Sequence, residues 1–360
     1  MLAAYVSGHG FGHATRTAEV LKALRRRAPG LALSVVTSGP EALYRDALPG
    51  AFAFRRLQCD VGLAQKDALR IDLGGTLAAW RAFAAAWPAR VRAEAAWLRT
   101  SGTRIVLGDV PPLAFAAAAE AGIRVVGVAN FSWDWIYRHL AREEPRLFEA
   151  AEAAREAYGR ADLLLRLPFA GDMTAFPRIE DVPLVARRPR VGRDEGRRRL
   201  GLDTRPAILL SFGGLGLPGF DPAVLAPLQG FSFLSAGEWA AGPKNLRSVA
   251  ASELAALGMG YEDLVGAADV VVTKPGYGIV ADAIGARTRL VYTERGDFPE
   301  YPIIVEGMQR LVPSVHVSNP DLMAGRLEDP IRRALGMPFP AEPDMSGADV
   351  VARRVLALLG

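Results

Sequence analysis

The sequence is poor in cysteine and lacks long uninterrupted apolar segments. Cys59 is the only cysteine among the 360 residues, so no internal disulfide can form and a disulfide-stabilised secreted scaffold is excluded. No stretch of ~18 or more uncharged apolar residues occurs, which argues against a membrane-spanning helix. The N-terminus lacks the basic region and long apolar core of a signal peptide. These absences predict a folded cytoplasmic protein with an inert thiol.

Positive charge is present, but its arrangement does not indicate nucleic-acid binding. The net charge is +4 and the isoelectric point is about 9.4. Arginine runs at residues 25–27, 187–188 and 197–199 are short and scattered, without interleaved aromatic residues. A solvated arginine-rich surface is favoured over a nucleic-acid footprint. Mild positive charge also suits a phosphate-bearing small substrate, and we expect membrane contact to be peripheral at most, because no clear amphipathic anchor is evident.

The sequence does contain a repeated alternation of strand-like and helix-like segments. In the first half, strands are predicted at residues 2–6, 31–37, 104–107, 125–129 and 163–167, and helices at 17–27, 77–99 and 113–121. In the second half, strands are predicted at 207–211, 231–235, 270–273, 288–292 and 312–317, and helices at 250–257, 261–267, 278–284 and 304–310. This alternation predicts the α/β class, with two Rossmann-like doubly wound parallel sheets in tandem.

A stretch rich in proline and arginine interrupts the alternation and separates the two halves. We expect an N-terminal domain at residues 1–168, a linker at 169–193 and a C-terminal domain at 194–340. The last segment, 341–360, contains an amphipathic helix that we expect to pack back on the first domain. Since ligands of parallel sheets bind at the carboxyl ends of the strands, the loops after the strands are the candidate site.

The first such loop is rich in glycine and runs from Ser7 to Arg16. Its glycines let the backbone turn sharply and approach a ligand, and the helix N-terminus beyond it offers amides to an anion. Gly8 and Gly10 match the dinucleotide fingerprint G-x-G-x-x-G, but the third position is His13 and the acid expected at the end of the second strand is absent. A nicotinamide enzyme is therefore disfavoured. A P-loop kinase is disfavoured as well, because no G-x-x-x-x-G-K-[ST] motif occurs.

Two of the four histidines, His9 and His13, lie in this loop. A neutral imidazole at a ligand cleft is a suitable general base for an acceptor hydroxyl. Both rings can instead hold the loop through backbone hydrogen bonds, but the strand-end position favours the catalytic interpretation. A metal site is disfavoured, because the pair is not on a helix face and has no third histidine or cysteine nearby.

In the second half, Ser211, Gly213 and Gly214 form a glycine turn after the strand at 207–210. Small residues at a strand end permit close approach to phosphates, although glycine turns are common.

A stronger pattern follows the strand at 270–273, where Lys274, Gly276, Tyr277 and Gly278 lead into a helix. The helix N-terminus can hold a diphosphate, and Lys274 can add a positive charge. Asp282, six residues after Gly276, can accept hydrogen bonds from a ribose diol. An interpretation of Asp282 as a solvated helix residue is equally open.

These motifs resemble those of the GT-B glycosyltransferases, especially the family of the MurG N-acetylglucosaminyltransferase and the nucleotide-sugar-dependent glucosyltransferases. Residues 8–13 are similar to the family's N-terminal glycine loop ending in histidine, and residues 276–282 to its glycine turn followed by an acid. The family usually has glutamate where this chain has Asp282. Its D-x-x-Q donor-sugar motif resembles the segment from Asp297 to Glu300, with glutamate in place of glutamine.

A closer resemblance is to the glycosyltransferase-like N-terminal region of plant L-arabinokinases and its bacterial relatives. It is carried by residues 8–13, 129–137 and 276–278. The sugar-kinase half of those proteins is missing here, so the resemblance does not imply arabinokinase activity.

The resemblance implies that the first domain binds the acceptor. Residues of the first loop and of the segment after the strand at 125–129 are the candidates, and tryptophans beside an acid suit stacking on a sugar or another flat face. Packing at the domain edge is the alternative for these tryptophans. The acceptor-binding candidates are Gly10, Phe11, Gly12, Asn130, Trp133 and Asp134.

Asp109 follows the strand at 104–107 directly. Its carboxylate can orient His13 as in a catalytic triad, or it can cap the following helix, and the sequence leaves both interpretations open.

The resulting hypothesis is a metal-independent hexosyl or N-acetylhexosaminyl transferase that uses no cofactor. A nucleotide-diphospho-sugar, with UDP favoured, is the expected donor, and His13 or His9 is the expected base for an acceptor of unknown identity. Two alternatives remain open: a nucleotide-sugar 2-epimerase, and a non-catalytic nucleotide-sugar-binding protein.

Overall fold

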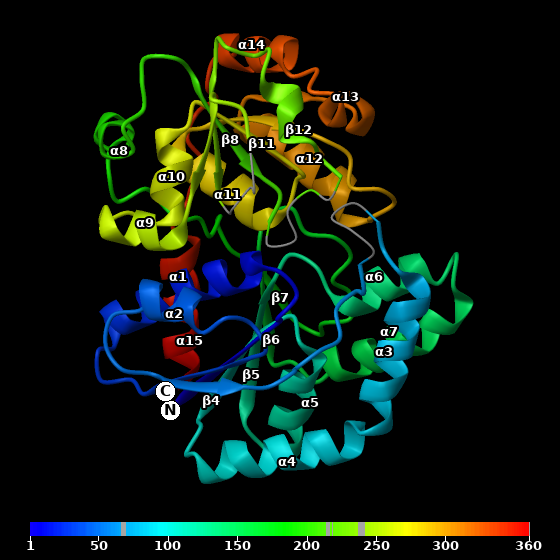
Figure 1. Ribbon diagram of the computed structural model, residues 1–360. Helices are drawn as coiled ribbons and strands as arrows, with labels where there is room; N and C mark the ends of the chain where they lie inside the picture. Colours follow the sequence, from blue (N-terminus) through cyan, green and yellow to red (C-terminus); the bar gives the residue numbers. More distant parts are fainter. Residues whose placement is uncertain (66–69, 214–216, 218, 237–241, 360) are drawn as a thin grey trace.

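The computed structural model folds the chain into two α/β domains that lie one above the other (Figure 1). It describes residues 1–65, 70–213, 217, 219–236 and 242–359. Within these ranges, no helix has the length and apolar character needed to cross a bilayer.

The first domain is built on a parallel sheet with the strand order β3-β2-β1-β4-β5-β6-β7. The strands are β1 (Leu2–Val6), β2 (Leu33–Thr37), β3 (Ala53–Arg56), β4 (Ile105–Asp109), β5 (Arg124–Ala129), β6 (Leu163–Arg166) and β7 (Ile179–Asp181). The helices are α1 (Phe11–Arg27), α2 (Ala42–Ala47), α3 (Leu73–Ala85), α4 (Trp87–Thr100), α5 (Pro112–Ala121), α6 (Trp133–Leu140) and α7 (Phe148–Tyr158), with a 3₁₀ turn at Pro145–Leu147.

The second domain repeats this plan with the strand order β10-β9-β8-β11-β12-β13. The strands are β8 (Ala207–Ser211), β9 (Ser232–Ala236), β10 (Leu246–Val249), β11 (Val270–Thr273), β12 (Arg289–Tyr292) and β13 (Ser314–His316). The helices are α8 (Arg193–Arg199), α9 (Ala251–Ala256), α10 (Tyr261–Ala267), α11 (Tyr277–Ala286), α12 (Glu300–Leu311), α13 (Asn319–Met323) and α14 (Glu328–Gly336), with a 3₁₀ turn at Pro222–Leu225.

The predicted fold class, two doubly wound parallel sheets, is confirmed. Central strands such as β1, β4 and β11 are buried at every position, as expected for strands that helices cover on both faces. The connecting helices begin and end where the sequence signals it. Helix α5 has Pro112 in its first turn and ends at Gly122, which adopts the left-handed conformation with φ 70°.

The structure corrects three of the predicted boundaries. Strand β7 joins the first sheet through β6, so that sheet extends into the range 169–193 that we expected to be a linker. The single helix predicted at 77–99 is two helices, because Pro88 has no N–H to donate and lies in the first turn of α4. Helix α1 begins at Phe11 instead of residue 17, which places His13 in its first turn.

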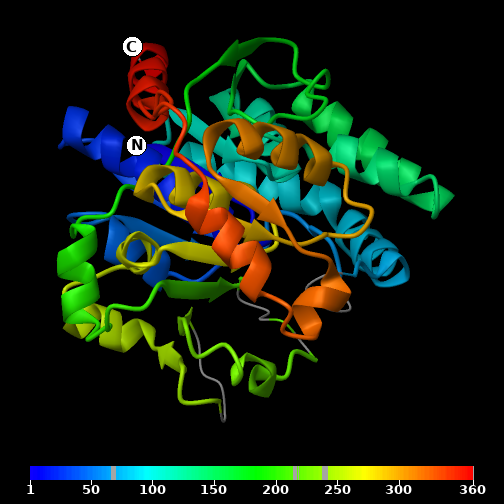
Figure 2. The ribbon, with the colours of Figure 1, turned by 90° about the horizontal axis from the view of Figure 1, so that it is seen from above.

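The chain ends in helix α15 (Gly347–Leu359), which lies against α1 of the first domain (Figures 1 and 2). Val351, Ala352 and Val355 are buried on this face. They belong to an apolar cluster that continues through Val185 of the connection into the second domain. The last helix therefore returns the chain to the first domain and ties the two domains together.

We expect replacement of Val351 by alanine to destabilise the protein by about 1–3 kcal/mol, since buried methyl groups would be lost and a cavity left between α15 and α1. Chemical denaturation measures this. Arg353→Ala, at an exposed position of the same helix, is the control and should change the free energy of unfolding by less than about 0.5 kcal/mol. Equal effects of the two substitutions would contradict the packing of α15.

Candidate active site

The carboxyl ends of the two sheets meet where the domains touch. In both sheets the strand order reverses at the centre, between β1 and β4 and between β8 and β11, and such switch points are where α/β sheets bind ligands. Helix α1 starts just after β1, and α11 starts just after β11. Their first turns are in contact, because a Cβ built on Gly278 would lie only 3.0 Å from Gly12 Cα.

The two helix N-termini at this contact are well suited to bind an anion. Gly10 and Gly276 are the N-cap residues of α1 and α11, and neither helix has a side-chain cap. Gly10 has a φ of 91°, a conformation that side-chain-bearing residues rarely adopt. Because the first-turn amides have no partner within a helix and carry partial positive charge, both N-termini favour a negatively charged group between the domains.

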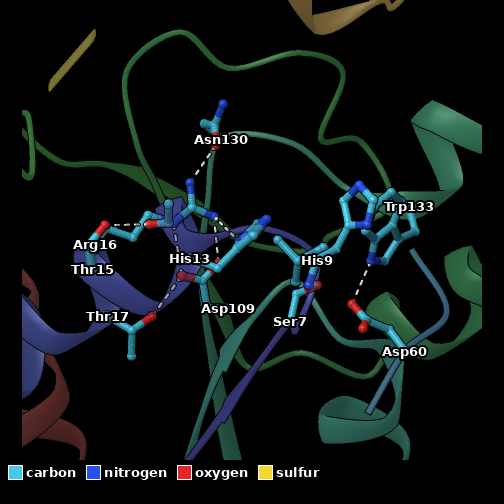
Figure 3. A network of polar contacts seen from close by, with 12 residues as sticks. Ser7, His9, His13, Thr15, Arg16, Thr17, Asp60, Asp109, Asn130 and Trp133 are labelled. Carbon is cyan, nitrogen blue, oxygen red and sulfur yellow. Dashed lines mark hydrogen bonds and ion pairs between the residues drawn. The ribbon is translucent and has the colours of Figure 1, made fainter. Parts of the chain in front are cut away.

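His13 contacts Asp109 directly, as one of the two open interpretations of Asp109 predicted. His13 Nδ1 lies 2.9 Å from Asp109 Oδ1, and both residues are buried (Figure 3). Parallel pairing of Val6 with Asp109 brings the ends of β1 and β4 to the same edge. Helix α5 has no side-chain cap, so Asp109 orients His13 instead of capping α5.

Asp109 also accepts hydrogen bonds from two neighbours on α1. Arg16 donates through Nε to Oδ2 at 2.8 Å and through Nη2 to Oδ1 at 2.5 Å, and Thr17 Oγ1 donates to Oδ2 at 2.7 Å (Figure 3). Burial alone would raise the pKa of Asp109, but the Arg16 charge and these hydrogen bonds hold it well below the ordinary value. The carboxylate is therefore ionised and can only accept.

Arg16 continues the network into the second domain through Asn130. Arg16 Nη1 donates to Asn130 Oδ1 at 2.6 Å, and Asn130 Nδ2 donates to Glu300 Oε1 at 2.7 Å. Arg295 donates to the other oxygen of Glu300 at 3.0 Å. Because Asn130 is fully buried and bonded on both sides, its predicted contact with an acceptor is not available. Likewise, the buried Glu300 bridges the domains in place of the expected open sugar ligand.

His9 lies half-buried on the other side of the first loop. Its ring packs edge-on against Trp133, with centroids 5.6 Å apart, and against the backbone of Gly62 (Figure 3). The backbone N–H of Leu63 points at His9 Nδ1 over a long 3.5 Å. Burial, together with the positive charges of Arg295 and Lys274 and the nearby His13, lowers the pKa of His9 to about 3. This imidazole is neutral at physiological pH.

The structure corrects the expected roles of Asp282 and Tyr277. Arg187, from the connection between the domains, donates to both oxygens of Asp282 at 3.0 and 2.5 Å. The carboxylate is buried in this pair and is not presented to a ribose. Tyr277 is buried as well, and its hydroxyl is bonded to the backbone of Val185. Both side chains attach the connection to the second domain.

Trp133 and Asp134 also lie in the domain interior, which favours the packing alternative for this segment. Trp133 is fully buried, stacks on Tyr137 and donates its indole N–H to Asp60 at 2.9 Å. Asp134 is buried with Arg155 3.6 Å away. Phe11, by contrast, is 47% exposed in the first turn of α1, and only one other large apolar side chain in the described part of the chain is as exposed.

The other donor-side candidates lie at the carboxyl ends of the second sheet. Ser211 Oγ is 2.5 Å from the hydroxyl of Tyr261, and Gly213 adopts a left-handed φ of 75°. Gly214 lies outside the described residues. Asp297 is exposed over 72% of its side chain and lies 3.0 Å from His139 of α6, so it contacts the first domain.

Sequence reasoning missed Arg16, Asp60 and Arg187. Arg16 lies one helical turn after His13, and this spacing places both side chains on one face of a helix. With the start of α1 placed correctly, the spacing would have indicated Arg16 as a neighbour of His13. Asp60 and Arg187 follow segments without periodic pattern, and their burial depends on contacts far away in the sequence. Across the described ranges, His, Cys, Asp and Glu side chains form no group of three or more with metal-ligand geometry.

A curated relative covers almost the whole chain. L-arabinokinase of Arabidopsis thaliana is 31% identical over an alignment of 362 positions, which covers 98% of this chain and 34% of the relative. The chain thus spans about a third of the length of that protein. No protein-family model matches the chain.

Solved glycosyltransferases share the fold. The glycosyltransferase of kitacinnamycin has a TM-score of 0.60 and 16% identity, over 100% of this chain and 95% of its own. A UDP-glucose:anthocyanidin 3-O-glucosyltransferase in complex with UDP has a TM-score of 0.59 and 11% identity, over 99% and 94%. MurG of Acinetobacter baumannii has a TM-score of 0.53 and 14% identity, over 99% and 99%. The predicted resemblances are confirmed: the chain has the GT-B glycosyltransferase fold and is related to a part of plant L-arabinokinase.

Proposed function

We propose that the protein transfers a sugar from a nucleotide-diphospho-sugar to an acceptor hydroxyl, with His13 as the general base. The observation that carries this proposal is the contact between His13 and the ionised Asp109 at the junction of the two sheets. A base at this position lies beside the helix N-termini that would receive the diphosphate. The proposed base and the site for the leaving diphosphate are therefore neighbours, as sugar transfer requires.

The hydrogen bonds of His13 favour the tautomer that a base needs. An ionised Asp109 can only accept, so Nδ1 carries the hydrogen and Nε2 has a free lone pair. The His13 side chain is buried except for 8% of its surface, and in this proposal the acceptor reaches the ring through that exposed part. In the proposed step, the acceptor oxygen attacks the anomeric carbon, its proton passes to Nε2, and the bond from that carbon to the diphosphate oxygen breaks. This single displacement inverts the anomeric centre.

His9 suits a different task. With a pKa near 3 it is a poor base, and the approach of the Leu63 N–H to Nδ1 leaves the hydrogen on Nε2. We assign it as a neutral hydrogen-bond donor to the substrate. On these grounds we propose His13, and not His9, as the base.

The donor would lie against the second domain, with its diphosphate on the first-turn amides of α11 and near Gly213. Lys274 and Arg295 both lower the pKa of His9, so positive charge lies on this side of the site, and we propose that transfer needs no metal ion. UDP is the favoured nucleotide, because two solved glycosyltransferases with this fold were crystallised with UDP. We propose hexose or N-acetylhexosamine as the sugar.

Calorimetric titration with UDP, dTDP, GDP and ADP tests the donor site. We expect UDP to bind with a micromolar dissociation constant. Lys274→Ala should weaken binding about tenfold or more, because a charged hydrogen bond to phosphate would be lost. Lys244→Ala, an exposed lysine of the same domain, is the control. Absence of binding by all four nucleotides would refute the donor assignment.

Turnover of UDP-sugars with a panel of acceptors tests the base. We expect His13→Ala to reduce turnover by about a hundredfold or more and to leave the affinity for UDP unchanged. His316→Ala, an exposed histidine at the end of β13, should retain activity. Unchanged turnover in His13→Ala would disprove the base assignment. An epimerised UDP-sugar formed without any acceptor would favour the epimerase alternative instead.

Acid titration tests the environment of His9. Its folded-state pKa of about 3 is below the unfolded value of about 6.5, so the unfolded chain binds the proton first and stability falls as the pH drops from about 6.5 toward 3. His9→Gln should make the free energy of unfolding less steeply dependent on pH in this window. Histidine NMR should show no titration of His9 above about pH 4. Titration of this ring near pH 6.5 would contradict its half-buried, positively charged surroundings.

A further inference from the structure

We propose that Arg16 and Asn130 are positioning residues that connect the base His13 to Glu300 of the second domain, so that the strength of the base depends on contact between the domains. This inference rests on the proposed role of His13 and adds the residues that control it. Neither Arg16 nor Asn130 would touch the reacting atoms. They act through the His13–Asp109 pair and through the interface between the domains.

Arg16 is positioned to influence the charge on His13, because its guanidinium is buried and is hydrogen-bonded to residues of the same network. It binds both oxygens of Asp109 and the amide oxygen of Asn130. Its Nη2 also lies 3.1 Å from His13 Nδ1 (Figure 3). The guanidinium carbon is 5.1 Å from the ring centroid of Tyr277 in the second domain. Arg16 is therefore the side chain through which the base pair contacts α11.

Asn130 completes the connection and can bind in only one orientation. Arg16 can only donate and the Glu300 carboxylate accepts, so the amide must present Oδ1 to the first and Nδ2 to the second. Asn130 is fully buried at the end of β5, and Glu300 is buried at the start of α12. The bridge thus exists only while the second domain lies against the first.

The charges around His13 explain why this bridge matters for a base. The transfer step makes His13 an imidazolium, and the Arg16 cation close to Nδ1 opposes that charge. Asp109 supplies one compensating negative charge, and Glu300 supplies a second that acts on Arg16. The charged or titratable groups that face this network from the neighbouring elements are His9, Asp60, Asp109, Lys274, Tyr277, Arg295 and Glu300.

If the domains separated, Glu300 would move away from Arg16. The positive charge of Arg16 beside His13 would then lose one of its two compensating negative charges. The base would weaken as the donor-binding domain moves away. The acceptor would therefore be deprotonated mainly when donor and acceptor are brought together.

A double-mutant cycle tests the connection. Asn130→Asp places two carboxylates opposite each other and should reduce turnover about a hundredfold, since like charges at hydrogen-bond distance repel. Glu300→Gln keeps the hydrogen bond from Asn130 and removes the charge. Combining both substitutions restores a bridge of reversed polarity, because the Gln amide can donate to the new carboxylate. We expect the double variant to recover about tenfold or more over Asn130→Asp alone.

Nitrogen-15 NMR of His13, assigned by its loss in His13→Ala, provides a readout that needs no turnover. We expect Glu300→Gln to change the nitrogen-15 chemical shifts of the His13 ring while Nδ1 keeps its hydrogen, because one negative charge beside Arg16 is lost. Glu306→Gln, in an exposed pair on the same helix, is the matched control and should change neither turnover nor these chemical shifts.

The outcomes separate this inference from the proposed function. A double variant no more active than Asn130→Asp, with unchanged chemical shifts of the His13 ring in Glu300→Gln, would overturn the inference even if the wild type transfers sugar. Wild-type protein without turnover, but with the expected change in the His13 ring shifts in Glu300→Gln, would refute the function and retain the connection. If thermal melting shows that Asn130→Asp does not fold, the NMR measurement on Glu300→Gln decides whether the inference holds.

Discussion

The buried carboxylate of Asp109 is the feature on which the rest of the site depends. A charge at this depth is stable only if donors surround it. His13, Arg16 and Thr17 provide those donors, and all three lie on the first two turns of α1. The same hydrogen bonds therefore hold α1 to the end of β4, fix the orientation of the imidazole and bury an arginine between the domains. Stability and proposed chemistry share one set of contacts.

Small residues allow the second domain to reach this network. Gly12 and Gly278 let the first turns of α1 and α11 approach closely, since a Cβ on Gly278 would need to displace its neighbour. This approach places α11 and α12 beside the Asp109 network and makes the Asn130–Glu300 bridge possible. The N-termini of both helices then converge on the same space, which concentrates partial positive charge there.

Several polar residues near the strand ends are held in internal hydrogen bonds and are not open to a ligand. Arg187 donates to Asp282, and Asn130 donates to Glu300. The indole N–H of Trp133 donates to Asp60. A two-domain protein must satisfy every polar group that it buries where its domains meet. A polar side chain at a strand end can therefore serve the interface or the ligand, and its position in the sequence does not distinguish the two.

The sequence by itself determined the α/β class, the tandem sheets and the loops at their carboxyl ends, because alternating apolar runs and glycine turns are local signals. It also singled out His13 and Asp109 as candidates. Only the tertiary structure decided that they touch, that Arg16 joins them, and that Asp282, Glu300, Asn130 and Trp133 are enclosed. Those outcomes depend on burial and on hydrogen bonds between residues far apart in the chain, and no local pattern encodes which of two polar partners a side chain will meet.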